Sequence, residues 1–263
     1  MFRRDPLQQV GRGAPLERQR EVPEETPIAF TYDRTTFAVM MASPSDLEDF
    51  ALGFSLTERL IEEPDEISAL EIVDLGNGLE LRMSLGVARS EELTLRRRRL
   101  AGPAGCGLCG IESLKAATSP PPHVSSDLRV TASTVFDALQ GLGNHQQLNA
   151  TTHAVHAAGF WSMRRGAFIA VREDVGRHNA LDKLIGALER AGEAPDSGFV
   201  VMTSRISIEL VQKLATHGCP ILVAISAPTA LAVREAENAG LTLAGVARTD
   251  SFEVYTGRRR IVL

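Results

Sequence analysis

The chain has 263 residues, of which 44% are hydrophobic, so it can build one large globular domain or two modest lobes and is not disordered throughout. Its 28 Lys and Arg against 33 Asp and Glu give a net charge of −5, and without an overall positive field the chain does not fit a dedicated nucleic-acid-binding protein. The N-terminus lacks an apolar signal segment, and prolines interrupt the longest uncharged run, residues 218–233, which predicts a cytoplasmic protein without membrane association.

The chain begins with a predicted tail, followed by a small α+β lobe over residues 26–99. Residues 1–25 are polar and lack apolar periodicity, so we expect them to be disordered. Ser43 and Pro44 predict the start of a helix, because they supply a capping hydroxyl and a proline at the first helical position. The expected strands of this lobe span residues 28–32, 36–40, 67–75 and 79–85, the last two joined by a tight Asn-Gly hairpin.

A glycine-rich loop and a proline run, together residues 100–127, separate this lobe from an α/β lobe over residues 128–263. In the second lobe, short β-like runs alternate with helical ones. The expected strands are 168–172, 199–203, 221–225 and 241–247, and the expected helices are 179–190, 207–217 and 229–239. This alternation predicts crossover connections and a largely parallel sheet between helices, that is, a three-layer α/β lobe.

Polar loops follow three of these strands, over residues 173–179, 204–207 and 226–229. Ligands of such sheets usually bind beyond the carboxyl ends of the strands, where helix N-termini offer unpaired N–H groups. Arginines and hydroxyls in these loops suit a phosphorylated or nucleotide-like ligand, whereas the alternative is that the hydroxyls only cap helices. A Walker A loop and a Gly-x-Gly-x-x-Gly fingerprint are both absent, so an ordinary ATPase or dinucleotide dehydrogenase is not supported.

Cys106 and Cys109 form a Cys-x-x-Cys pair on a glycine-rich backbone, and the arginine run 96–99 precedes them. One hypothesis is thiol or persulfide chemistry, because a neighbouring thiol can lower the pKa of its partner or resolve an adduct. The run of arginines could add positive potential or simply be solvated. The third cysteine, Cys219, precedes Pro220 at the start of an apolar strand and is expected to be a buried packing residue.

Zinc binding is the alternative for the cysteine pair, and an incidental pair also remains open. His153 and His156 could complete a tetrahedral site with the two cysteines, although they lie far along the chain. This interpretation would make the protein a zinc-stabilised nucleotide-binding protein without sulfur transfer. A zinc deaminase is excluded, because Gly105 replaces the proline of its Pro-Cys-x-x-Cys motif and no His-x-Glu occurs.

From about Glu24 to its end, the chain resembles the FdhD family of formate dehydrogenase accessory sulfurtransferases. Ordered segments carry the resemblance: residues 46–54 (DLEDFALGF), 105–110 (GCGLCG), 152–158 (THAVHAA), 172–183 (REDVGRHNALDK), 204–207 (SRIS) and 226–229 (SAPT). The resemblance implies a cytoplasmic homodimer whose C-terminal lobe is similar to the cytidine-deaminase fold without the deaminase zinc motif.

The resemblance also implies a function. Proteins of this family accept sulfur from a cysteine desulfurase as a cysteine persulfide and deliver it to the molybdenum or tungsten bis-pterin guanine dinucleotide cofactor before that cofactor enters formate dehydrogenase. Cys106 would then carry the persulfide with Cys109 as helper, and no permanently bound metal is expected. The cofactor would be held as a client through its guanine nucleotide portions, which GDP can mimic.

The expected cofactor-binding residues combine the polar loops with the segment near the C-terminus that matches the family's aromatic-rich cofactor segment. They are Arg177, His178, Asn179, Asp182, Ser204, Arg205, Ser226, Thr229, Phe252, Tyr255 and Thr256. Asp182 and Lys183 could instead form a helical surface pair or cap the fold. Glu253 departs from the Asn expected in the family, and a carboxylate pointing toward phosphates would be unfavourable.

Overall fold

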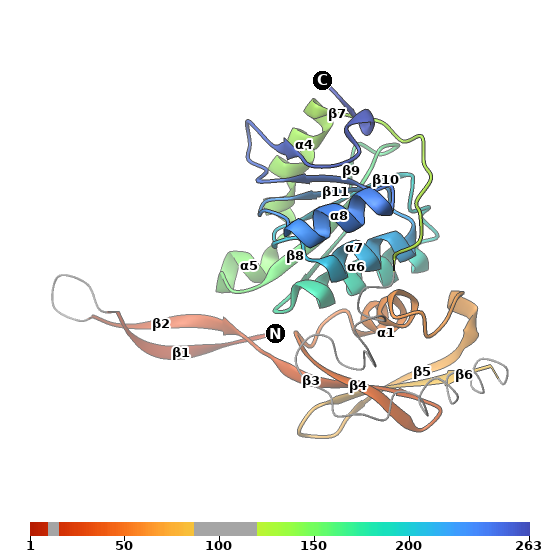
Figure 1. The fold of residues 1–263 in the computed structure, drawn as a ribbon. Helices are drawn as coiled ribbons and strands as arrows, with labels where there is room; N and C mark the ends of the chain where they lie inside the picture. Colours follow the sequence, from red (N-terminus) through yellow and green to blue (C-terminus); the bar gives the residue numbers. More distant parts are fainter. Residues whose placement is uncertain (10–15, 87–119) are drawn as a thin grey trace.

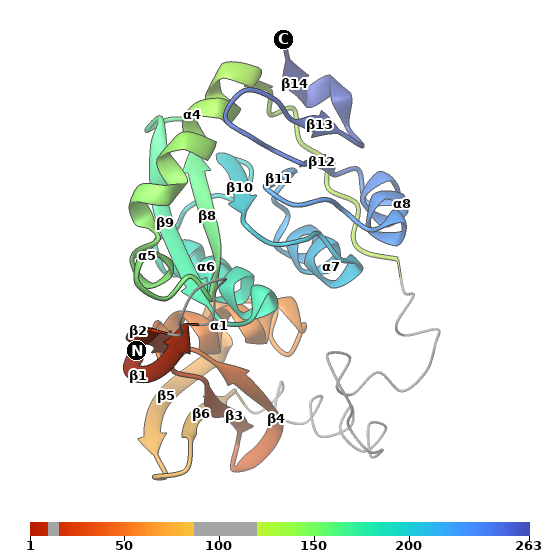
Figure 2. The ribbon, with the colours of Figure 1, turned by 90° about the vertical axis from the view of Figure 1, so that its left-hand side faces the viewer.

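The structure is a computed structural model that describes residues 1–9, 16–86 and 120–263. Two sheets organise it: a four-stranded sheet in the order β4-β3-β6-β5 and a six-stranded sheet in the order β13-β12-β11-β10-β8-β9. Helix α1 (Leu47–Thr57) lies between the smaller sheet and the helices of the larger one (Figures 1 and 2). Across the described ranges, none of the helices combines the length and the apolar character needed to cross a membrane.

An antiparallel hairpin opens the chain and reaches out from the rest of the molecule (Figure 1). Its strands are β1 (Phe2–Gln9) and β2 (Leu16–Pro23), with Phe2 opposite Pro23. This arrangement differs from the disordered tail expected for residues 1–25. Backbone hydrogen bonds hold the two strands together, along with polar cross-strand contacts such as Arg4 Nη2 to Glu21 Oε1 at 2.8 Å. Because these contacts are polar, the sequence lacks the apolar alternation from which a strand is predicted.

The N-terminal lobe follows the predicted order of elements. It contains β3 (Thr26–Tyr32), β4 (Thr35–Ala42), α1, the short 3₁₀ helix η1 (Pro64–Glu66), β5 (Ile67–Asp74) and β6 (Leu79–Leu85). Strand β3 pairs antiparallel with β4 and parallel with β6. Phe30, Phe50 and Phe54 are buried between the sheet and α1, so the apolar face of the helix covers the sheet. The predicted Asn-Gly hairpin between β5 and β6 is confirmed.

Helix α1 begins later than the sequence predicts. Its N-cap is Asp46, which has a left-handed backbone with φ 52°, and no side chain caps the helix. Ser43 instead serves the junction with the second lobe, where its Oγ accepts a hydrogen bond from Val175 N at 3.2 Å. Tertiary contact therefore overrides the local capping signal at Ser43 and Pro44.

The second lobe contains the predicted alternation and several further elements. In chain order they are β7 (Val130–Thr131), α4 (Ala132–Leu142), η2 (Gly143–His145), α5 (Gln147–Thr152), β8 (His156–Ser162), β9 (Ala167–Asp174), α6 (Arg177–Arg190), β10 (Gly198–Met202), α7 (Ile208–His217), β11 (Ile221–Ala224), α8 (Ala230–Asn238), β12 (Thr242–Gly245), β13 (Glu253–Val254), η3 (Arg258–Arg260) and β14 (Ile261–Val262). The expected strands and helices between residues 167 and 245 are confirmed within a few residues.

Helices cover both faces of the six-stranded sheet. The expectation of a largely parallel sheet is wrong, because β8 pairs antiparallel with β9 and β10 and β13 pairs antiparallel with β12. Strands β10, β11 and β12 are parallel neighbours, whereas β8 runs antiparallel to both β9 and β10. Strand β9 therefore points in the same direction as β10, and the carboxyl ends of β9 to β12 meet at one edge. Helices α6, α7 and α8 lie on one face and α4 on the other, so the lobe has the expected three layers (Figure 2).

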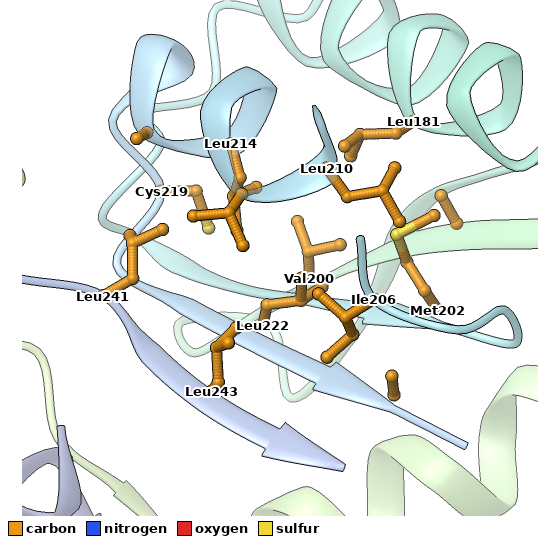
Figure 3. Close-up of a cluster of buried hydrophobic side chains, with 14 of the residues drawn as sticks. Leu181, Val200, Met202, Ile206, Leu210, Leu214, Cys219, Leu222, Leu241 and Leu243 are labelled. Carbon is orange, nitrogen blue, oxygen red and sulfur yellow. The ribbon is translucent and has the colours of Figure 1, made fainter. Parts of the chain in front are cut away.

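Cys219 lies in the apolar layer between the sheet and its helices, close to Leu214 and Leu241 (Figure 3). It is fully buried, as the sequence predicts, and burial raises the pKa of its thiol to about 12. This thiol is therefore a packing group and is poorly suited to act as a nucleophile.

Helices α1 and α6 cross at two glycines, and this crossing joins the lobes. A Cβ atom on Gly53 would lie 1.7 Å from Asp182 O, and one on Gly186 would lie 1.9 Å from Asp49 O. Only glycine fits such an approach of two backbones. The lobes are consequently packed as one body along this crossing.

Candidate functional site

The loops at the carboxyl ends of β10, β11 and β12 form one continuous edge through backbone hydrogen bonds. Thr229 N donates to Ile206 O at 3.0 Å, and Val246 N donates to Ser226 O at 3.2 Å. Ile206 and Pro228 also form an isolated parallel bridge. The polar loops that the sequence singled out are therefore adjacent in the structure, as expected for strand ends of a parallel arrangement.

The first turn of α6 adds Arg177 and His178 to this edge. Gly176 N donates to Asp174 Oδ1 at 2.7 Å, which turns the chain from β9 into the helix. His178 Nε2 lies 3.4 Å from Ser207 Oγ at the start of α7. The Nε atom of Arg177 is buried and has no hydrogen-bond partner within the described part of the chain, so it is a donor available to a bound acceptor.

The positive charge of the edge comes from arginines. Burial, followed by the charge of Arg177, lowers the pKa of His178 to about 4, and the same two causes lower the pKa of His156. Both imidazoles are therefore neutral near pH 7. Arg205 is exposed in the loop between β10 and α7, so Arg177 and Arg205 are cationic groups of the edge that could attract phosphate oxygens.

The three hydroxyl residues of the edge differ in burial and in hydrogen-bond partners. Ser204 is 2% exposed, and its Oγ donates to Arg205 O at 3.2 Å. Thr229 Oγ1 accepts from Ala232 N at 3.2 Å and caps α8, which is the capping alternative named from the sequence. Ser226 is half-buried between these loops. The edge therefore offers helix N-termini and hydroxyls alongside the two arginines.

Asn179 and Asp182 face the N-terminal lobe instead of the edge. Asn179 Nδ2 donates to Met41 O and to Asp174 Oδ1, both at 2.9 Å. Asp182 accepts hydrogen bonds from Thr57 Oγ1 at 2.7 Å and from Lys213 Nζ at 3.0 Å. These polar atoms are engaged in joining the lobes, and the surface ion pair suggested for Asp182 and Lys183 does not form, because both side chains are buried with other partners.

The three expected residues near the C-terminus lie in three different surroundings. Tyr255 packs near Gly245 at the end of β12, and its hydroxyl donates to the carboxylate of Glu253. Phe252 packs edge-on against Phe136 of α4, with ring centroids 5.3 Å apart. Thr256 is buried, and its Oγ1 bonds the backbone of Leu241 and Leu243 within the sheet. Of these residues, Tyr255 lies closest in the fold to the polar edge.

Arg248 also lies at this edge, although it was not among the residues expected from the sequence. It follows β12 and donates from Nη1 to Ile225 O at 2.7 Å and to Ala247 O at 2.9 Å. The same rule that found the other loops would have found it, because residues 241–247 were an expected strand and Arg248 comes directly after it. The edge therefore carries a third arginine.

The cysteine pair Cys106 and Cys109 and the arginines of residues 96–99 lie outside the described residues. Of the proposed zinc ligands, His153 is exposed at the end of α5 with φ 54°, and His156 is half-buried at the start of β8. Within residues 1–9, 16–86 and 120–263, His, Cys, Asp and Glu side chains form no group of three or more that could hold a metal ion.

A sequence model of the FdhD/NarQ family matches residues 23–262. The chain is 50% identical over 263 residues to a protein of Agrobacterium fabrum named "Sulfur carrier protein FdhD", covering 100% of this chain and 97% of that protein. It is 52% identical over 247 residues to a protein of the same name from Brucella abortus, covering 94% of this chain and 91% of that protein. The fold is similar to that of a protein from Desulfotalea psychrophila described as a formate dehydrogenase accessory protein, with a TM-score of 0.76, 24% identity and 99% coverage of both chains.

Proposed function

Because this chain belongs to the FdhD/NarQ family, we propose that it is a sulfurtransferase that accepts sulfur from a cysteine desulfurase as a persulfide and carries it to a molybdenum or tungsten bis-pterin guanine dinucleotide. The client cofactor would then pass to formate dehydrogenase. The observation that carries the proposal is 50% identity across the whole chain to a protein named as a sulfur carrier.

Cys106 is the proposed persulfide site and Cys109 its helper. In the uptake step, the Cys106 thiolate attacks the terminal sulfur of the desulfurase persulfide. The donor S–S bond breaks, the donor cysteine leaves as a thiolate, and the transferred sulfur ends as Cys106–S–S⁻. The step conserves electrons and needs no added oxidant. Cys219 takes no part in it, because its thiol is buried and its pKa is raised.

The polar edge of the large sheet is the proposed cradle for the nucleotide portions of the client. Arg177 supports this role most directly, because its buried Nε has no partner among the described residues. Arg205, Ser204, Ser226 and Thr229 would add charge and hydroxyls to phosphate contacts, and Tyr255 would border the ring or ribose. Asn179, Asp182, Phe252 and Thr256 would support the cradle through their contacts inside the protein.

Several wider features belong to the same proposal. The C-terminal lobe would be related to the cytidine-deaminase fold, with its sheet edge used for binding instead of zinc chemistry. The chain would act as a homodimer and as a chaperone for the bound cofactor. The cytoplasm is the proposed compartment, because a persulfide relay needs cysteines that are kept reduced between cycles.

Intact-protein mass spectrometry tests the sulfur relay. Incubation with a cysteine desulfurase and cysteine should add about 32 Da per sulfur to the wild-type chain, the mass of a persulfide sulfur. Cys219→Ala, the matched control, should keep the adduct, whereas Cys106→Ala with Cys109→Ala should lose it. An adduct that survives the double variant would overturn the assignment. Stoichiometric zinc that is lost in both Cys106→Ala and His153→Ala would favour the zinc-stabilised nucleotide-binding protein instead.

A further inference from the structure

A pocket of about 320 Å³ lies where helices α1, α6 and α7 end. The last turn of each helix contributes to its wall: Thr57 of α1, Glu189 of α6 and His217 of α7. Helix α7 begins at the polar edge, and its ten residues rise by about 15 Å before they reach this pocket. The pocket is therefore separate from the residues proposed to hold nucleotide phosphates.

The charge around this pocket is mainly negative. The carboxylates of Glu62, Glu63 and Glu189 line it together with one guanidinium, that of Arg59. Arg59 Nη2 donates to Thr216 Oγ1 at 3.4 Å, which holds this cation against the wall. The C-terminal ends of the three helices add partial negative charge, roughly half an elementary charge each. These charges favour a cationic guest over an anionic one.

His217 supplies the pocket with a buried polar atom that lacks a partner. The side chain is 1% exposed, and its Nδ1 atom lies 3.3 Å from Glu189 Oε1. The carboxylate favours the proton on Nδ1, which leaves the Nε2 lone pair of the neutral ring as an acceptor. Nε2 is buried and has no hydrogen-bond partner within the described part of the chain. An unpaired buried acceptor is unfavourable, so a guest that donates an N–H to it would be stabilised.

Apolar side chains and an engaged hydroxyl complete the wall. Ile61 and Ile185 line the pocket and are buried, so they offer a methylene chain an apolar surface. Thr57 Oγ1 donates to Asp182 Oδ1 at 2.7 Å and accepts from Lys213 Nζ at 2.9 Å, so it is already engaged. The polar head of a guest must therefore meet the imidazole and the carboxylates. The volume, at the low end of about 300–1,000 Å³ for small-molecule sites, limits the guest to a small group.

We propose that this pocket binds a primary ammonium group on a short aliphatic stem, the group that a lysine side chain and a free diamine share. One N–H is donated to His217 Nε2, the charge lies beside the carboxylates, and the stem packs along Ile61 and Ile185. The inference goes beyond the proposed function, because neither the sulfur relay nor the nucleotide cradle uses these residues. A bound ammonium group would bridge the last turns of α1, α6 and α7 and so contact both lobes.

Amide NMR titration of the ¹⁵N-labelled full-length chain tests the pocket with probes that share one stem. n-Butylammonium carries a charge and N–H donors, butyltrimethylammonium carries the charge without a donor, and 1-butanol carries no charge. We expect n-butylammonium to cause saturable shift changes at the amides of Thr216 and His217. Butyltrimethylammonium should bind about tenfold more weakly, the effect of losing a hydrogen bond from a charged group. 1-Butanol should cause no saturable change.

Two variants locate the binding. His217→Phe keeps a ring but removes the acceptor, and it should raise the dissociation constant of n-butylammonium about tenfold. Glu63 is exposed, so Glu63→Gln tests the pocket even if His217→Phe fails to fold, and it should raise this constant about threefold. Glu237→Gln removes the same charge from the exposed end of α8, outside the pocket, and is the matched control that should not change binding.

The proposal is overturned if n-butylammonium causes no saturable change at these amides, if butyltrimethylammonium binds equally, or if both pocket variants bind like the wild type. Two further ligands distinguish the source of the ammonium group. Tighter binding of 1,4-diaminobutane indicates a free diamine, whereas tighter binding of N-acetyl-lysine methylamide indicates a lysine of a partner protein.

Discussion

Lys183 Nζ lies 2.6 Å from Asp174 Oδ2, and both side chains are completely buried. The pair also joins the lobes, because Lys183 Nζ donates to Ser43 O at 2.8 Å and Asp174 Oδ2 accepts from Ser43 N at 3.0 Å. The turn that begins α6 uses the same carboxylate through Gly176 N. One ion pair thus fixes both the junction between the lobes and the position of Arg177.

Replacing Lys183 should destabilise the protein strongly. Lys183→Met leaves the Asp174 carboxylate buried without its cation, and breaking a buried pair in this way costs about 3–5 kcal/mol. Urea unfolding of the variant measures the loss. Arg82→Ala is the control, because Arg82 is half-exposed beside Glu71 and Glu80, where such pairs contribute about 1 kcal/mol or less. Equal losses in the two variants would contradict the role of the buried pair.

The close crossing of α1 and α6 predicts that alanine is tolerated at some glycines and not at others. Gly53→Ala and Gly186→Ala each place a methyl group less than 2 Å from a carbonyl oxygen of the facing helix, so both should destabilise the fold by about 3 kcal/mol or more. Gly143→Ala should have little effect, because nothing lies within 4 Å of its Cβ position. Thermal unfolding distinguishes them. If Gly53→Ala melts like Gly143→Ala, the helices do not cross as closely as the structure shows.

His178 should make stability depend on pH. Burial lowers its pKa to about 4, so below about pH 6.5 the unfolded chain binds a proton that the folded chain does not. Stability from this residue is therefore lost as the pH falls from about 6.5 to 4. When the pH is lowered from about 7 to 4.5, the free energy of unfolding of His178→Gln should fall by about 2.5 kcal/mol less than that of the wild type.

The contribution of Asp182 to stability changes with pH in the opposite direction, so the effect of His178 has to be separated from it. Burial raises its pKa to about 6, so the folded chain binds a proton more readily than the unfolded one and gains stability as the pH falls from about 6 to 4. The wild-type curve combines both residues, and only the difference between wild type and His178→Gln, from urea unfolding at each pH, isolates the histidine. Parallel curves would show that the imidazole is not desolvated.

Ligand protection should depend on the arginines of the edge. GDP at about 100 times its dissociation constant should stabilise the folded chain by about 2.7 kcal/mol, because it binds the native state alone. Arg177→Ala and Arg205→Ala should reduce the resulting shift in the thermal midpoint. Arg164→Ala, in the exposed turn between β8 and β9, should leave the shift intact. Undiminished protection in both edge variants would remove these arginines from the nucleotide site.

The alternating part of the second lobe could be predicted because its strands and helices have strong and different apolar periodicities. Strand β8 gave no such signal. It contains Gly159, where a Cβ would lie 2.8 Å from Phe168 Cε1, so the position requires a residue without β-propensity. The order of the sheet, with β8 between β9 and β10, could not be read from local pattern either.

The edge residues could be predicted because strand ends are a local property of the chain. Arg177, Ser204, Arg205, Ser226 and Thr229 follow from it directly. The partners of Asn179 and Asp182 depend instead on contacts with Met41 and Thr57, which lie far away in the sequence. Pairings of this kind form only when the two lobes dock, so the partners of Asn179 and Asp182 could not be predicted from sequence motifs.

The crossing of Gly53 and Gly186 constrains how such a chain can diverge. A larger residue at either glycine requires the opposite helix to move away, because the two backbones are in direct contact there. We therefore expect α1 and α6 to vary together among related chains. A chimera that takes its two lobes from distant relatives should fold only when both helices come from the same protein.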